Sequence, residues 1–206
     1  MQARYSATNQ ALHWITAACM FAILPLAWVM THAKEGTPYS AALFNWHKTL
    51  GVIVLVVTAI RIVWRFREPP PPYPPGVARF DQTLAHVVYW LFFAVLLWMP
   101  ITGGLLTLFG AHPIRFFNLI ATPQLVAPDR DLAALFGALH SAGQWAVYAL
   151  IALHLAAVAL HLIWSRDGVL GRMLPANAAE PRPVRPPPQR GEVVSRRAAS
   201  LASKSS

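Results

Sequence analysis

Four long apolar stretches constrain the fold of this chain more than any other feature of its sequence. They cover about residues 11–30, 46–66, 84–109 and 139–164. Each is close to the roughly 20 residues that a helix needs to cross the hydrocarbon core of a bilayer. Apolar residues gathered in blocks of this length indicate membrane spans. The sequence therefore predicts an all-α protein, an integral membrane four-helix bundle.

The composition agrees with a membrane protein. Of the 206 residues, 56% are hydrophobic and 12% are charged, whereas a soluble domain averages about 25% charged residues. The net charge is +9, but most of the cationic residues lie outside the apolar stretches. We therefore attribute the positive charge to membrane topology and not to nucleic-acid binding. Membrane lipid is the partner that the composition implies.

The distribution of lysine and arginine near the span ends predicts the orientation. The positive-inside rule places both termini in the cytoplasm. The expected cytoplasmic side carries Arg4, Arg65, Arg67, Arg79, Arg166 and Arg172, and the expected outer side carries Lys34, Lys48, Arg115 and Arg130.

The segments outside the spans predict where the domain ends. Ser6 and Asp129 are expected to cap the first and fourth helices ahead of their apolar stretches. Residues 68–76, EPPPPYPPG, read as a stiff polyproline connector, and residues 114–120 as a short amphipathic segment at the surface. Beyond Met173 the chain is rich in Pro, Ala, Ser and Arg. We expect a bundle domain over 1–175 and a disordered cytoplasmic tail over 176–206.

Histidines placed within or beside the spans are the candidate site residues. An imidazole is expensive in hydrocarbon, so each one needs a partner. Haem iron would explain several of them at once, because neutral imidazole is a haem ligand. The chain has one cysteine, Cys19, and no C-x-x-C-H motif, so any haem would be held non-covalently. These histidines are His13, His47, His86, His140 and His154, followed by His161.

The expected orientation gives each histidine a depth. His47 and His140 lie near the outer face, where they can pair across an outer haem. His154 is fourteen residues after His140, about 21 Å deeper and within roughly 40° of the same helical face. It can pair with His13 across an inner haem. By residue counting alone, His161 and His86 compete for that inner haem.

Alternative explanations apply to several of these residues. A single histidine at a membrane interface is usually a hydrogen-bonded interfacial residue. His161 is close to Trp164 and Arg166, which favours an interfacial or haem-propionate role over ligation. Arg61 either snorkels to the interface or pairs with an inner haem propionate, because a guanidinium grips carboxylates bidentately.

The chain resembles the bacterial four-helix cytochrome b561 family over roughly residues 4–175. The resembling stretches are RYSATNQALHW at 4–14, NWHKTLGVIVLVVTAIRIVWR at 45–65, LAH at 84–86 and HSAGQWAVYALIALHLAAVALHLIWSRDGVLGRMLP at 140–175. The resemblance implies a di-haem electron carrier of the bacterial inner membrane, with two b-type haems held between the helices. It implies as axial ligands His13, His47, His140 and His154, in preference to His161 and His86.

The resemblance also implies a function. Family members are similar to carriers that exchange electrons with quinone, and some resemble oxidoreductases that oxidise superoxide at the outer face and reduce ubiquinone. We expect a cytochrome b that moves electrons between an outer-face donor and the quinone pool. One alternative is a membrane-anchor subunit of a dehydrogenase or hydrogenase, which needs a redox partner protein. Another is a non-redox channel or metal transporter that uses histidines as a permeation path.

Overall fold

The computed structural model describes residues 4–73, 77–165 and 168–175. The chain divides into two units, Met1–Met173 and Leu174–Ser206. Of the second unit only Leu174 and Pro175 are described, so the expected disorder of the tail at 176–206 concerns residues outside the described part. All four long helices belong to the first unit.

The first two helices begin at side-chain caps. α1 (Ala7–His32) follows Ser6, whose hydroxyl accepts a hydrogen bond from the Asn9 N–H at 3.3 Å. α2 (Pro38–Arg67) follows Thr37, whose hydroxyl accepts one from the Ser40 N–H at 3.1 Å. Such caps satisfy N–H groups that have no partner within the helix. The predicted cap at Ser6 is confirmed, and it starts α1 ahead of its apolar stretch.

The third and fourth helices also extend beyond their apolar stretches. α3 spans Arg79–Phe109 and contains Pro100. α4 spans Arg130–Leu160 and is capped by the Asp129 carboxylate, which accepts from the N–H groups of Asp131 and Leu132, both at 3.0 Å. The predicted cap at Asp129 is confirmed. The end of the predicted fourth span is a five-residue π-helix, η1 (His161–Ser165), and a 3₁₀ turn, η2 (Leu170–Met173), follows.

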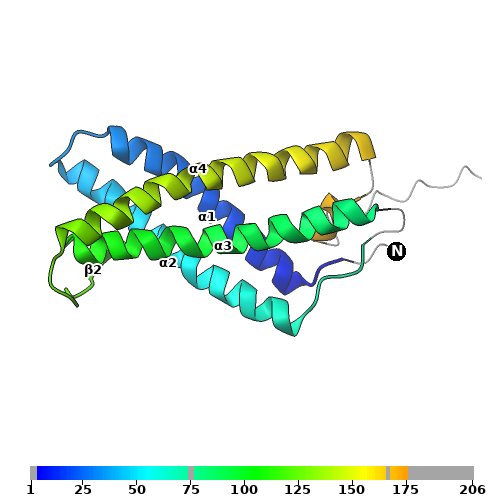
Figure 1. Cartoon of the computed structure of the whole chain (residues 1–206), viewed down its shortest axis with the longest axis horizontal. Helices are drawn as coiled ribbons and strands as arrows, with labels where there is room; N and C mark the ends of the chain where they lie inside the picture. The colour runs from blue at the N-terminus through cyan, green and yellow to red at the C-terminus, as the bar shows by residue number, and fades with distance from the viewer. Residues whose placement is uncertain (1–3, 74–76, 166–167, 176–206) are drawn as a thin grey trace, which may run out of the picture. The chain divides into compact units, whose positions relative to one another are not determined.

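The helices form an up-and-down bundle (Figure 1). α1 packs against α2, α2 against α3, and α3 against α4. α1 and α3 begin at one end, which we call the terminal end, and α2 and α4 begin at the other, which we call the loop end. Few large apolar side chains are buried among the described residues, and many, such as Trp28, Phe66 and Trp164, are exposed. Because all four helices are long and apolar enough to cross a membrane, lipid can cover this outward surface.

A hairpin occupies the loop between α3 and α4. β1 (Arg115–Phe116) pairs in antiparallel fashion with β2 (Ile120–Ala121). The sequence predicted a single amphipathic segment here, and the structure has a turned-back pair of short strands instead. Phe117 and Asn118 make the turn with φ values of 51° and 62°. Asparagine tolerates this left-handed backbone, but phenylalanine adopts it rarely.

A returning segment closes the terminal end. After η1 the chain comes back to the start of α1, where the Tyr5 N–H donates to the carbonyl oxygen of Arg172 at 3.2 Å. The Arg172 side chain is buried and donates from Nη2 to the carbonyl oxygens of Pro71 and Pro72 at 2.8 and 3.0 Å. One residue of the returning segment therefore joins the polyproline connector to the N-terminus.

A carboxylate ties the ends of α1 and α2 together beside this segment. Oε2 of Glu68 accepts hydrogen bonds from Ser6 Oγ at 2.7 Å, Asn9 Nδ2 at 3.1 Å and Trp64 Nε1 at 2.7 Å. Ser6 and Asn9 precede His13 by seven and four residues, so they lie on the same face of α1. This cluster therefore helps to hold the face of α1 that carries His13.

Candidate functional site

Four of the predicted site histidines meet in two pairs inside the bundle. His13 of α1 and His154 of α4 have ring centroids 6.3 Å apart, with their planes at 61°. His47 of α2 and His140 of α4 have ring centroids 6.1 Å apart, with their planes at 86°. The structure thus brings together the partners that depth along the spans predicts.

α4 contributes one ring to each pair and so sets the distance between them. Fourteen residues separate His140 from His154, which is about 21 Å along a helix and nearly a whole number of turns. His47 and His140 form the loop-end pair, and His13 and His154 form the terminal-end pair. The bundle therefore holds two pairs of imidazoles at two depths.

The backbone of α3 orients the His140 ring. Its Nδ1 lies 2.9 Å from the carbonyl oxygen of Met99 and 3.3 Å from Oγ1 of Thr102. A carbonyl oxygen only accepts hydrogen bonds, so we assign the proton of the neutral ring to Nδ1, which leaves the lone pair on Nε2. Histidines that ligate metals usually donate their other N–H to a carbonyl or carboxylate in this way.

A glycine allows this close approach. A Cβ atom at position 103 would lie 3.0 Å from Cε1 and 3.2 Å from Nδ1 of His140, which is tighter than ordinary van der Waals contact. At the neighbouring Gly104, an added Cβ would meet nothing within 4 Å. Gly103 is therefore the one of the two glycines whose missing side chain makes room for the ring.

His47 has an unpaired ring nitrogen. Its Nδ1 is buried and has no hydrogen-bond partner. Burying an unpaired polar atom is costly, so native structures rarely leave one without a role.

The spacing of the rings in both pairs can be compared with that of two imidazoles on one metal ion. A metal–imidazole bond is about 2 Å long, and two rings on opposite sides of one ion therefore have centroids roughly 6 Å apart. The ring spacing of both pairs fits that arrangement.

Aromatic rings surround the terminal-end pair. The His13 ring contacts the Trp14 ring edge-on at 5.3 Å between centroids, and the His154 ring contacts Phe92 at 5.5 Å. Neither aromatic ring offers a lone pair to a metal, because the indole N–H is only a donor and phenylalanine has no polar atom. The imidazoles are therefore the metal-binding groups in this immediate setting.

Arg61 lies beside the terminal-end pair. Its Nη1 donates to Oγ1 of the buried Thr16 at 3.1 Å, and its Cζ lies 5.5 Å from the centre of the Phe93 ring. Thr16 is one helical turn from His13 on α1. The guanidinium therefore bonds to a buried group of the bundle, and snorkelling to the interface does not describe it. It has five N–H donors, so a further acceptor can be bound.

The two competing histidines lie elsewhere. His86 is exposed on α3, and its Nε2 accepts a hydrogen bond from Nε1 of Trp90 at 3.0 Å. His161 begins the π-helix, seven residues beyond His154, and is half-buried. The ring that meets His13 belongs to His154.

Sequence reasoning missed three contributors to the site. Gly103, the Met99 carbonyl group and Thr16 act through contacts between helices. The Gly-Gly pair at 103–104 is visible in the sequence, but two adjacent glycines in a helix by themselves indicate only a loosened helix. Only the rotation of α3 against α4 shows which glycine faces the ring.

The donor set suits a metal whose remaining ligands come from a macrocycle. Across residues 4–73, 77–165 and 168–175, no three or more His, Cys, Asp or Glu side chains gather closely enough to hold an ion. A protein-only zinc site needs three or four such ligands. Two facing imidazoles are the axial set of a haem iron, and a b-type haem fits the residues present.

The comparisons with known proteins agree with this chemistry. The family described as prokaryotic cytochrome b561 matches residues 4–176, and the chain belongs to this family. It is 26% identical over 178 residues to cytochrome b561 homolog 2 of Escherichia coli strain K12, covering 86% of this chain and 94% of that protein. It is 28% identical over 178 residues to probable superoxide oxidase CybB of Yersinia pestis, covering 85% of this chain and 98% of that one.

Family membership and the four spans define the class of protein. The chain is a bacterial multi-pass membrane cytochrome b with a role in electron transfer, and it binds b-type haem. This family membership decides against the alternative of a non-redox channel or metal transporter.

Proposed function

We propose that the chain holds two b-type haems, one at each histidine pair. His47 and His140 are the axial ligands at the loop end, and His13 and His154 are those at the terminal end. The observation that carries this proposal is the presence of two imidazole pairs with ring centroids 6.1 and 6.3 Å apart, at two depths. When bound, haem supplies one-electron chemistry, which the protein tunes through its ligands, hydrogen bonds and burial.

Arg61 is proposed to bind a haem propionate at the terminal-end pair. Its bond to Thr16 aims the guanidinium beside His13 and leaves further N–H donors for a carboxylate. His161, seven residues beyond His154, is proposed as a second propionate contact and not as a ligand.

The proposed activity is electron transfer between a donor at the outer face and the quinone pool of the bacterial inner membrane. Two haem sites at different depths would connect the two faces. With both termini in the cytoplasm, the loop-end pair lies near the outer face. Superoxide is the proposed donor and ubiquinone the proposed acceptor, and the similarity to the probable superoxide oxidase of Yersinia pestis supports the donor.

The haem sites are tested by counting haem in purified variants. A pyridine haemochrome assay with quantitative amino-acid analysis should give two haems per chain, both low-spin. His47→Ala and His140→Ala should each remove one haem, and His13→Ala and His154→Ala should each remove the other. The redox titration of the remaining haem identifies which site each variant has lost.

The matched controls are the histidines that lie outside the pairs. His86→Ala and His161→Ala should each retain two haems, since neither residue is an axial ligand in this assignment. A ratio near one in the unaltered protein contradicts the two-haem proposal. Loss of the terminal-end haem in His161→Ala, with retention in His154→Ala, would move the ligand to His161.

The donor and acceptor are tested on the purified holoprotein with superoxide and a soluble ubiquinone. Superoxide should reduce the haems, and quinol should then form. Superoxide dismutase should abolish both signals. Haem that is not reduced by superoxide, together with a soluble subunit that copurifies and reduces it, would favour the membrane-anchor alternative.

A further inference from the structure

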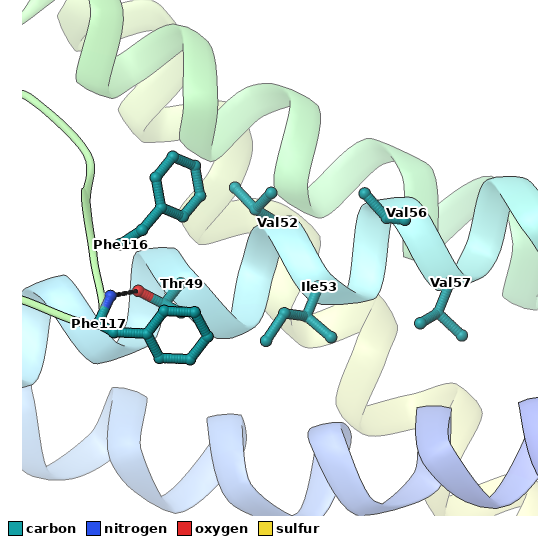
Figure 2. Close-up of a pocket in the computed structure, with 7 residues that line it drawn as sticks. All are labelled: Thr49, Val52, Ile53, Val56, Val57, Phe116 and Phe117. Atoms are coloured by element: carbon teal, nitrogen blue, oxygen red, sulfur yellow. Dashed lines mark hydrogen bonds between the residues drawn. The ribbon is translucent and has the colours of Figure 1, made fainter. Parts of the chain in front are cut away.

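An apolar slot lies on the outward face of α2, beneath the hairpin of the α3–α4 loop. It has a volume of about 280 Å³ and is lined by Thr49, Val52, Ile53, Val56, Val57, Phe116 and Phe117. Figure 2 shows the two phenyl rings at one end, with the four aliphatic side chains continuing along α2. The slot therefore runs lengthwise along a membrane span, starting from the loop end.

The slot and the loop-end histidines use opposite sides of α2. Thr49 follows His47 by two residues, which places it roughly 200° around the helix. Val56 and Phe117 are about half exposed, at 52% and 51%, so the slot opens outward. On the outward face of a membrane span, the surrounding medium is lipid.

The hairpin is fastened to form this slot. Thr49 is 1% exposed, and its Oγ1 accepts the Phe117 N–H at 3.1 Å, the contact drawn in Figure 2. Next to it, Nδ2 of Asn45 donates to Oδ1 of Asn118 at 2.8 Å. These bonds hold Phe117 at a φ of 51°, a backbone conformation that persists only where the surroundings enforce it. The phenyl rings are therefore held over α2 by specific contacts.

Two basic residues are sequence neighbours of slot-lining residues at the loop end. Lys48 precedes Thr49, and its Nζ is 3.5 Å from the carbonyl oxygen of Pro113, which leaves donors to spare. Arg115 is exposed on β1, and its carbonyl oxygen is 3.4 Å from Thr49 Oγ1. Within the described part of the chain, neither side chain forms an ion pair. A phosphate group would complement both charges.

We propose that the slot binds one acyl chain of an anionic phospholipid whose phosphate is held by Lys48 and Arg115. The slot alone cannot select a lipid, because the bilayer interior is as apolar as its walls. The two cations supply the selection, since each basic residue near the surface favours an anionic headgroup. The site does not depend on haem binding or on the proposed activity.

The experiment measures lipid retained by the purified holoprotein. Protein in nanodiscs of equal phosphatidylglycerol and phosphatidylcholine is transferred to mild detergent, and the bound lipid is quantified by native mass spectrometry. The unaltered protein should keep phosphatidylglycerol with a roughly ten-fold preference. The double variant Lys48→Gln/Arg115→Gln should lose that preference. Val56→Trp, which fills the slot, should lower retention of both lipids without changing haem content.

The matched control removes two other cations from the same end of the bundle. Lys34→Gln/Arg130→Gln changes the net charge by the same amount, and neither residue is next to a slot-lining residue in the sequence, so this variant should keep the preference. If both double variants lost the preference for phosphatidylglycerol equally, the preference would come from general surface charge, and the proposed site would be wrong. Full lipid retention by Val56→Trp would also contradict the proposed site. The proposal would be wrong as well if the molecule retained were an isoprenoid quinone and not a phospholipid.

Discussion

At the scale of single residues, the hydrogen bonds of each imidazole decide which nitrogen is available to a metal. His140 uses Nδ1 for the Met99 carbonyl oxygen, while His86 uses Nε2 to accept from Trp90. In the part-buried His140 ring, Nε2 therefore stays available to a metal. In the exposed His86 ring, Nε2 is already occupied by the hydrogen bond from Trp90. Residue type alone does not distinguish the two histidines.

Gly103→Ala is expected to weaken the loop-end site. The added Cβ would lie 3.0 Å from the His140 ring, and overpacking of this kind costs about 1–3 kcal/mol. Removing a helical glycine offsets up to about 1 kcal/mol of that cost. The variant should lose part of the loop-end haem during purification, as measured by haem content and by redox titration of the remainder.

Gly104→Ala is the matched control for that change. It makes the same substitution one position along α3, where the new Cβ meets nothing within 4 Å. It should keep the haem content of the unaltered protein and show an equal or higher thermal unfolding temperature. Equal haem content in the two variants would show that the His140 ring shifts without consequence and that Gly103 has no special role at the loop-end site.

At the scale of elements, the segment after η1 acts as a structural part of the bundle. η2 is only four residues long, too short to be stable alone. It is held by the bonds of Arg172 to the connector and to Tyr5. The stability of the terminal end therefore depends on a residue that lies beyond the last membrane span.

Arg172→Ala is expected to destabilise the terminal end by about 2 kcal/mol, because it removes two hydrogen bonds from a charged donor. Truncation after Ser165 should have at least as large an effect, whereas truncation after Pro175 should leave haem content and spectra unchanged. Thermal unfolding of the detergent-solubilised holoprotein measures all three.

Arg79→Ala is the control for loss of a cation at the same end. Arg79 is exposed at the start of α3, and surface changes of this kind usually stay within about 0.5 kcal/mol. An Arg172→Ala variant as stable as Arg79→Ala would mean that the returning segment merely rests on the bundle.

At the scale of the whole molecule, the orientation of the bundle in the membrane decides which histidine pair lies near the outer face. The excess of arginine at the terminal end predicts that both termini lie in the cytoplasm. In a Cys19→Ala background, Leu119→Cys should react with a membrane-impermeant maleimide in intact spheroplasts, because Leu119 is 83% exposed on the hairpin. Arg79→Cys should react only after the membrane is permeabilised.

The reverse labelling pattern would invert the topology. The histidine pairs and the lipid slot would remain as described, but the terminal-end pair would then face the donor. Labelling of both positions in intact spheroplasts would indicate leaky membranes, which a cytoplasmic marker protein detects in the same sample.

The sequence by itself determined the four spans, the caps at Ser6 and Asp129, and the depths at which histidines can pair. These properties are local: hydropathy marks a span, a cap acts within one turn, and depth follows from a rise of about 1.5 Å per residue. Residue counting left His154, His161 and His86 as possible partners of His13; the family resemblance favoured His154, and the tertiary structure brings the His154 ring to His13. Only the tertiary structure decided that Gly103 and not Gly104 faces His140, and that the α3–α4 loop is a hairpin docked on Thr49. Each of these depends on the rotation of one helix against another or on a contact between distant segments, and residue spacing along a single helix does not specify either.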